Sequence, residues 1–155
     1  MNWKAPHISK IYEALTAIAD GRVQMGENMA KVYSSSRGKY YDVAYDPAAG
    51  SIGSNDNTAY FTGALSYPMI SYLMNIGHIT YDKSVAARLK GILWKDINQR
   101  HKNNYDAAID EVLDELRKND VETGEITTEI ARIYEQVLAL NVSRLPSRKR
   151  PPKAY

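Results

Sequence analysis

The chain has 155 residues, no cysteine, and 20 basic against 18 acidic residues. This length suffices for one core, and the lack of cysteine excludes disulfides, thiolate metal sites and cysteine nucleophiles. The N-terminal residues lack the apolar region of a signal peptide, and no apolar run approaches the roughly 20 residues of a membrane span. We therefore expect a soluble, cytoplasmic protein with no membrane segment.

The first predicted element is a long helix over residues 8–33, because apolar residues recur there at intervals of three and four. The row consists of Ile11, Leu15, Ile18, Met25, Met29 and Val32, with Arg22 at its centre. Burying an unpaired charge costs several kcal/mol. Arg22 therefore predicts a carboxylate, a water-filled cavity, a subunit interface or an anionic ligand beside it.

In residues 39–57 the pattern changes to alternation, which is typical of strands. Tyr41, Val43 and Tyr45 alternate with other residues, and residues 46–50 have the composition of a turn. The segment predicts a short β-hairpin or an ordered crossover loop. A second helix is expected over residues 58–76, with a kink at Pro68, and Gly77 as its C-terminal cap.

The second half of the chain predicts further helices. One begins near Asp82 and carries apolar residues as far as Leu116, and the sequence leaves open whether it stops and restarts at Asn103 and Asn104. The last helix is expected over residues 127–140. After Val142 the apolar pattern ends.

These elements predict an all-α fold: a four- or five-helix bundle with a short β-hairpin or ordered crossover loop between the first two helices. Residues 1–142 are expected to form a single helical domain, and residues 143–155 a basic, proline-containing flexible tail. The tail contains five cations and no acid. These are the candidate nucleic-acid contacts: Arg144, Arg148, Lys149, Arg150 and Lys153.

A bundle builds its sites from inward polar residues on facing helices. Two polar clusters stand out besides Arg22, one ahead of the second helix and one within the third. The first cluster also has a structural interpretation, as a helix cap. The second has one as an ion pair of Asp96 with Arg100 or with Arg22. The candidate ligand-binding residues are Arg22, Asp56, Asn57, Lys95, Asp96 and Asn98.

The sequence lacks the motifs of several large enzyme classes. Neither the Glu-x-x-His and His-Glu-x-x-His metal motifs nor the phosphate-loop and Gly-x-Ser-x-Gly motifs occur. We therefore expect no metal and no cofactor, and the catalytic residues, if any, are unknown. Tyrosine is present 12 times, and this amphipathic side chain suits subunit contacts.

Three functions follow from these observations. The first is a homo-oligomeric helical bundle with an interaction or scaffolding role. The second is an enzyme or binding protein whose polar pocket between helices accepts a small anionic or nucleotide-like ligand. The third and weakest is nucleic-acid binding through the basic tail, because the body of the chain lacks a basic face.

Overall fold

The computed structural model describes residues 2–147 and 149–153 and shows an α/β fold. The helices are α1 (Ser9–Ala19), the π-helix η1 (Thr58–Thr62), α2 (Tyr67–Asn75), α3 (Lys83–Arg88), α4 (Trp94–Arg100), α5 (Tyr105–Lys118) and α6 (Gly124–Leu138). The strands are β1 (Val23–Gly26), β2 (Met29–Tyr33), β3 (Tyr40–Asp46), β4 (Ser51–Ser54) and β5 (Ser143–Arg144).

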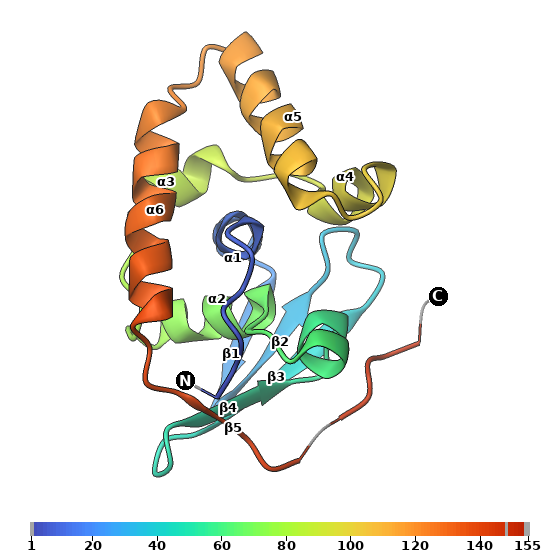
Figure 1. The fold of residues 1–155 in the computed structure, drawn as a ribbon, viewed down its shortest axis with the longest axis vertical. Coiled ribbons are helices and arrows are strands. Elements are labelled where there is room, and N and C mark those ends of the chain that lie inside the picture. The colour runs from blue at the N-terminus through green and yellow to red at the C-terminus, as the bar shows by residue number, and fades with distance from the viewer. Residues whose placement is uncertain (1, 148, 154–155) are drawn as a thin grey trace.

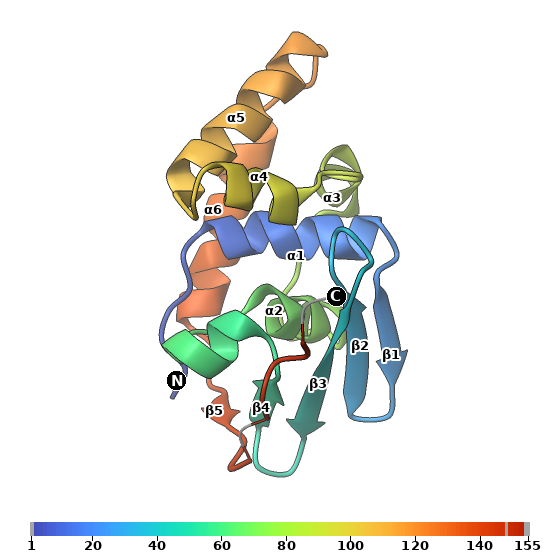
Figure 2. The ribbon, with the colours of Figure 1, turned by 90° about the vertical axis from the view of Figure 1, so that its right-hand side faces the viewer.

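Among the described residues, five strands form one mixed sheet in the order β1-β2-β3-β4-β5. The first four strands are antiparallel neighbours, and β5 pairs parallel with β4. Helix α1 crosses the middle of the molecule, with α2 and the sheet on one side and α3, α4 and α5 on the other (Figures 1 and 2). Its side chains at Ile11, Ala14 and Leu15 are fully buried. Helix α1 is therefore the centre of the core.

The expected all-α bundle is wrong, and the largest error lies in residues 20–33. The first helix ends at Ala19, because Gly21 adopts a left-handed backbone with φ of +68°. Residues 23–33 then form the β1–β2 hairpin, whose two-residue turn contains Asn28 at φ of +56°. Met25 and Met29 of the predicted apolar row are more than 40% exposed on these strands.

The expected helix over residues 58–76 is divided into η1 and α2 at Gly63, whose φ is +68°. Pro68 does not kink a helix. It occupies the first turn of α2, where the backbone N–H that proline lacks would have no partner within the helix. The last turn of α2 ends just ahead of Gly77, which has a left-handed φ of +84°.

The predicted third helix is three separate helices. Gly91 lies between α3 and α4 and has a positive φ. Lys102 and Asn103 lie between α4 and α5 and also have positive φ. The side chain of Asn104 then caps α5 by accepting a hydrogen bond from the backbone of Ala107 at 3.1 Å. The predicted helix therefore stops and restarts at Asn103 and Asn104.

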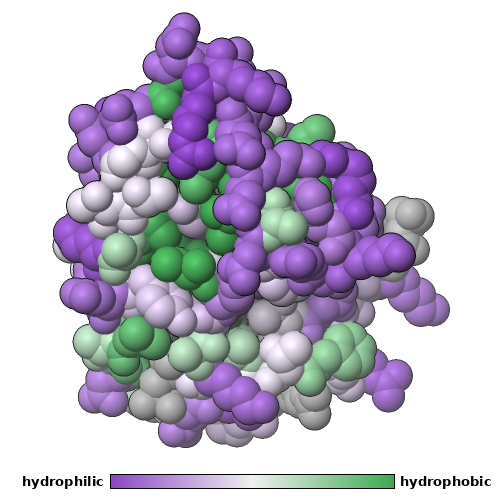
Figure 3. All heavy atoms as spheres, turned by 45° about the horizontal axis from the view of Figure 1, so that its top comes forward, coloured by the Kyte–Doolittle hydropathy of each residue, from purple (hydrophilic) through white to green (hydrophobic). Residues whose placement is uncertain are grey.

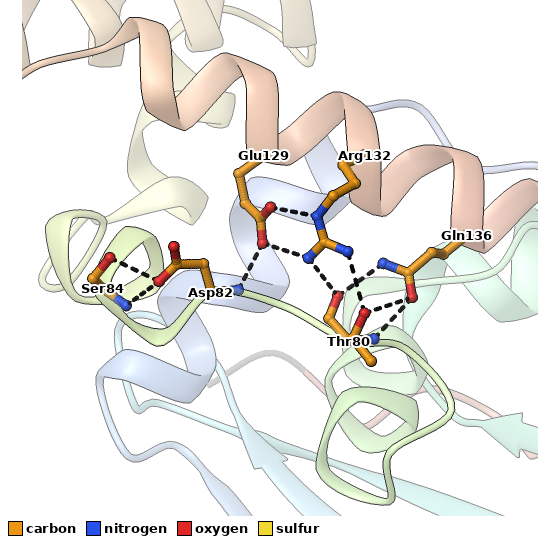
Figure 4. A network of polar contacts seen from close by, with 6 residues as sticks. All are labelled: Thr80, Asp82, Ser84, Glu129, Arg132 and Gln136. Atoms are coloured by element: carbon orange, nitrogen blue, oxygen red, sulfur yellow. Dashed lines mark hydrogen bonds and ion pairs between the residues drawn. The ribbon is translucent and has the colours of Figure 1, made fainter.

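A polar network fixes helix α6 to the loop between α2 and α3 (Figure 4). The backbone N–H of Asp82 donates to Glu129 at 2.6 Å, and Arg132 donates to the same carboxylate at 2.7 Å. Gln136 accepts from the backbone N–H of Thr80 and donates to its carbonyl oxygen, both at 2.9 Å. These contacts hold α6 against the rest of the fold.

Polar side chains cover much of the face drawn in Figure 3, with apolar side chains exposed between them. Helix α5 shows the same division, since Ala108, Ile109, Val112 and Leu113 are buried while its acidic residues face outward. In the described part of the chain, no helix is long and apolar enough to cross a membrane.

Candidate functional site

A polar cavity of about 440 Å³ opens between α1, the β2–β3 loop, β3, the start of η1 and helix α4. It is lined by Lys10, Glu13, Arg22, Ser34, Ser35, Lys39, Tyr41, Asp56, Asn57, Thr58, Tyr67, Trp94, Lys95, Asn98, Gln99, Asn103 and Tyr105. These residues come from segments far apart in the sequence. The volume lies in the range of pockets that hold small-molecule ligands.

The structure brings five of the six candidate ligand-binding residues to this cavity: Arg22, Asp56, Asn57, Lys95 and Asn98. The sixth, Asp96, is exposed and does not line it. Asp96 also does not neutralise Arg22, whose carboxylate partner is Asp20. The alternative pairing of Asp96 with Arg100 does not form either, because Arg100 binds Glu111.

Arg22 is 2% exposed and follows directly after the turn that ends α1. Its Nε donates to the carboxylate of Asp20 at 3.0 Å, and its Nη1 donates to the carbonyl oxygen of Tyr33 at 2.5 Å. The remaining terminal nitrogen, Nη2, has no hydrogen-bond partner among the described residues. Arg22 therefore joins the end of α1 to β2 and still lines the cavity with an unused donor.

Among the described residues, two carboxylates line the cavity, and both already have partners. Glu13 accepts from Lys10 at 2.9 Å, and both residues are only 7% exposed. Asp56 accepts from the hydroxyl groups of Ser54 and Ser66 and from the backbone N–H of Ala59. Asp56 thus caps the start of η1, as the sequence interpretation of a helix cap allowed.

Lys10 is held in an ion pair on one wall of the cavity. Burial lowers its pKa and is the largest single effect, but the charges and hydrogen bonds of Glu13 and Tyr105 together outweigh it, and the net pKa is raised. Its Nζ also lies 4.1 Å from the ring centre of Tyr105, a cation–π contact. Lys10 is therefore a charged but occupied member of the lining.

Several polar groups of the lining can donate hydrogen bonds and have no acceptor among the described residues. The hydroxyl groups of Tyr41 and Tyr67 make no hydrogen bond within the described part of the chain. Burial raises the pKa of Tyr41 to about 12 and also raises the pKa of Tyr67, so both phenols stay protonated at neutral pH. Lys39 and Lys95 form no ion pair with the described residues.

Asn98 provides a buried amide with nothing to bind. Its side chain is 7% exposed, and its Oδ1 has no hydrogen-bond partner among the described residues. Such an unsatisfied buried acceptor costs about 1–3 kcal/mol. Asn98 lines the cavity, but its Oδ1 is itself closed off from solvent, so a ligand that carries a hydroxyl or amino group would remove this cost only after the side-chain amide turns toward it.

Trp94 supplies the rigid base of the site. Its indole N–H donates to Thr16 at 2.9 Å, and the hydroxyl of Thr16 donates to the carbonyl oxygen of Leu89 at 2.9 Å. The ring is 2% exposed. These buried contacts fix helix α4 on α1 and thereby position Lys95 and Asn98, which follow Trp94 on the same helix.

Several lining residues were not among the candidates predicted from the sequence. Lys10 and Glu13 are three residues apart on one helix, a spacing that pairs opposite charges, and this was the available signal. Lys39 and Tyr41 belong to the segment that was assigned only as a hairpin or loop. No spacing rule within the chain connects that segment with α4.

The basic tail is partly ordered. Ser143 and Arg144 form β5, and the Arg144 guanidinium lies 4.5 Å from the ring centre of Trp3. Lys149, Arg150 and Lys153 are exposed. Arg148, also a candidate nucleic-acid contact, lies outside the described residues. Nucleic-acid binding by the tail stays a prediction.

Within residues 2–147 and 149–153, no three His, Asp or Glu side chains are grouped so that they could hold a metal ion. Comparison with the curated proteins and with the solved structures gives no significant match. A family model does match, over residues 3–143, and its description is "uncharacterised conserved protein UCP014422". The match covers most of the chain, which therefore belongs to this family.

Proposed function

We propose that the protein binds a small anionic ligand with at least one hydroxyl or amino group, in the cavity between α1, the β2–β3 loop and α4. The observation that carries this proposal is the unsatisfied, buried amide of Asn98 in the lining of a cavity that also contains two lysines without an ion-pair partner among the described residues. Glu13 is neutralised by Lys10, whereas Asp56 accepts hydrogen bonds from neutral groups only and keeps its negative charge. The four lining cations against the three carboxylates of Glu13, Asp56 and the Asp20 partner of Arg22 still leave a net charge of +1.

Electrostatics also supports an anion. Among the described lining residues are four cations and two carboxylates. Lys10 is neutralised by Glu13, and Arg22 by Asp20. Lys39 and Lys95 form no ion pair with the described residues, and their charges attract an anion into the cavity that they line.

The test is thermal unfolding of the wild type and of Asn98→Leu, with ribose 5-phosphate, AMP and citrate as probes at constant ionic strength. A ligand at 100 times its Kd adds about 2.7 kcal/mol of stability, which for a chain of this size raises Tm by roughly 5–10 °C. Asn98→Leu should unfold at the wild-type temperature or above it without ligand, because leucine removes an unsatisfied polar group. The probe should no longer raise its Tm.

Asn75→Leu is the matched control, because Asn75 is exposed at the end of α2 and does not line the cavity. It should keep the full ligand-induced shift. The proposal is wrong if no probe stabilises the wild type, or if Asn98→Leu responds like the wild type. The homo-oligomer stays a prediction, and sedimentation at several protein concentrations tests it.

A further inference from the structure

Two lysines, Lys39 and Lys95, line the side of the cavity that is made by the β2–β3 loop and helix α4. Lys39 immediately precedes β3, and Lys95 is in the first turn of α4. The two elements are joined directly, since the backbone N–H of Lys95 donates to the hydroxyl of Ser35 at 3.2 Å. The loop and the helix therefore hold the two ammonium groups on one wall.

The two lysines interact unfavourably in the free protein. The pKa of Lys39 is lowered, first by burial and then by the positive charge of Lys95. Neither lysine has an ion-pair partner among the described residues. Like charges held together without a counter-ion cost stability, and an anion placed between them would relieve that cost.

The charge of this pair favours a dianion. A phosphate monoester carries a charge of about −1.5 to −2 at neutral pH and presents three acceptor oxygens. A carboxylate or a phosphodiester carries a single negative charge and would leave part of the charge of Lys39 and Lys95 unbalanced. The hydroxyl groups of Ser34 and Ser35 line the same side of the cavity and can add hydrogen bonds to phosphate oxygens.

The position of Asn98 and the volume of the cavity indicate the size of the ligand. It lies three residues after Lys95 on α4, so the two side chains share one face with roughly 5–6 Å between their Cβ atoms. Inorganic phosphate can bridge two groups at this distance, but it would leave most of the cavity empty. A phosphate attached to a hydroxyl-bearing body, such as a sugar, spans this distance and leaves room in a cavity of about 440 Å³.

We propose that the ligand is a phosphate monoester of a hydroxylated compound, a sugar phosphate or nucleoside monophosphate, whose phosphate lies between Lys39 and Lys95 and whose hydroxyl groups reach Asn98. This inference rests on the proposed function and assigns its ligand class. The tyrosine hydroxyls of the cavity are further donors to the body of such a ligand.

Isothermal titration calorimetry with three classes of probe tests it. Ribose 5-phosphate and AMP are monoesters, cyclic AMP is a diester with the same base and sugar as AMP, and ribose and adenosine are neutral. The wild type should bind a monoester at least tenfold more tightly than cyclic AMP and should not bind the neutral probes measurably. The variant Lys39→Gln/Lys95→Gln should lose at least tenfold in monoester affinity and should no longer prefer the monoester over cyclic AMP.

The control Lys90→Gln/Lys118→Gln makes the same change in net charge at two exposed lysines away from the cavity. It should bind as the wild type does. Equal binding of AMP and cyclic AMP by the wild type, or an equal loss in the control variant, contradicts the phosphate assignment but not the cavity. Binding of no probe, together with no response to citrate, overturns the proposed function itself.

Discussion

Replacing Arg22 by methionine should lower the free energy of unfolding by about 3 kcal/mol. The substitution removes two charge-assisted hydrogen bonds, to Asp20 and to the carbonyl oxygen of Tyr33. Each such bond contributes about 1.5–3 kcal/mol. The loss of stability should lie near the sum of the two lower values, about 3 kcal/mol. The reason is that Asp20 keeps the hydrogen bond from the backbone of Gly91 and that the Asp20 side chain is 14% exposed. Methionine also preserves apolar contacts.

Urea unfolding monitored by tryptophan fluorescence and circular dichroism measures this loss. A loss of about 3 kcal/mol corresponds to a fall in Tm of roughly 6–12 °C for a chain of this length. The control is Arg117→Met, because Arg117 pairs with Asp114 on the surface and is 54% exposed. It should cost less than about 1 kcal/mol. An equal cost for both variants, or a stable Arg22→Met, would refute the assignment of Arg22 as the link between α1 and β2.

Three further predictions concern other parts of the molecule. Thr16→Val should cost about 2 kcal/mol in urea unfolding, because it leaves the buried indole N–H of Trp94 without an acceptor, whereas a neutral effect would show that the indole finds another partner. The neighbouring Arg100 guanidinium holds the pKa of Glu111 at about 2, and His101 adds to this effect. The carboxyl signal of Glu111 in an NMR titration should therefore have its midpoint near pH 2, and in Arg100→Met it should move toward the ordinary value. Since the folded pKa lies below the unfolded one, this group stabilises the fold above about pH 4.5 and loses that effect as the pH falls toward 2. Gly63→Ala should cost about 1–2 kcal/mol because of its left-handed backbone and because the added Cβ would lie 2.5 Å from Nη2 of Arg144, and unchanged thermal stability would contradict that local structure.

Local chemistry could be predicted from the sequence where it depends on neighbours in the chain. The β3–β4 hairpin has its turn at residues 47–50, as the alternation and the turn composition indicated. Asp82 caps α3 by accepting a hydrogen bond from the backbone of Ser84 at 2.8 Å. These features need only a few adjacent residues, so their signals are complete within the sequence.

The first helix was extended too far because two periodicities overlapped. Apolar residues from Met25 to Val32 fit the helical interval, but Ala30 and Val32 also alternate as they do in β2, where both are buried. The decisive residues are Gly21 and Asn28, whose positive φ values end the helix and turn the hairpin. Glycine and asparagine do not require a positive φ, so the sequence alone could not distinguish a continued helix from the hairpin.

The candidate site could be predicted by residue type but not by arrangement. Arg22 was selected because a charge in an apolar row needs a partner, and Lys95 and Asn98 were selected as members of a polar cluster within the predicted third helix. Asp96 was grouped with them by proximity in sequence, although its direction on α4 differs by about 100° from that of Lys95. Their convergence with Lys39 depends on how the hairpin packs against α4, which no local pattern contains.

The most direct test of the central claim is an NMR titration of the wild-type protein, labelled with ¹⁵N, with ribose 5-phosphate and AMP. The backbone amides of the β2–β3 loop, the start of η1 and helix α4 should shift together with one Kd. The side-chain amide of Asn98 should shift with them. Shifts confined to the basic tail, or an unchanged Asn98 signal at saturation, would contradict a ligand site in this cavity.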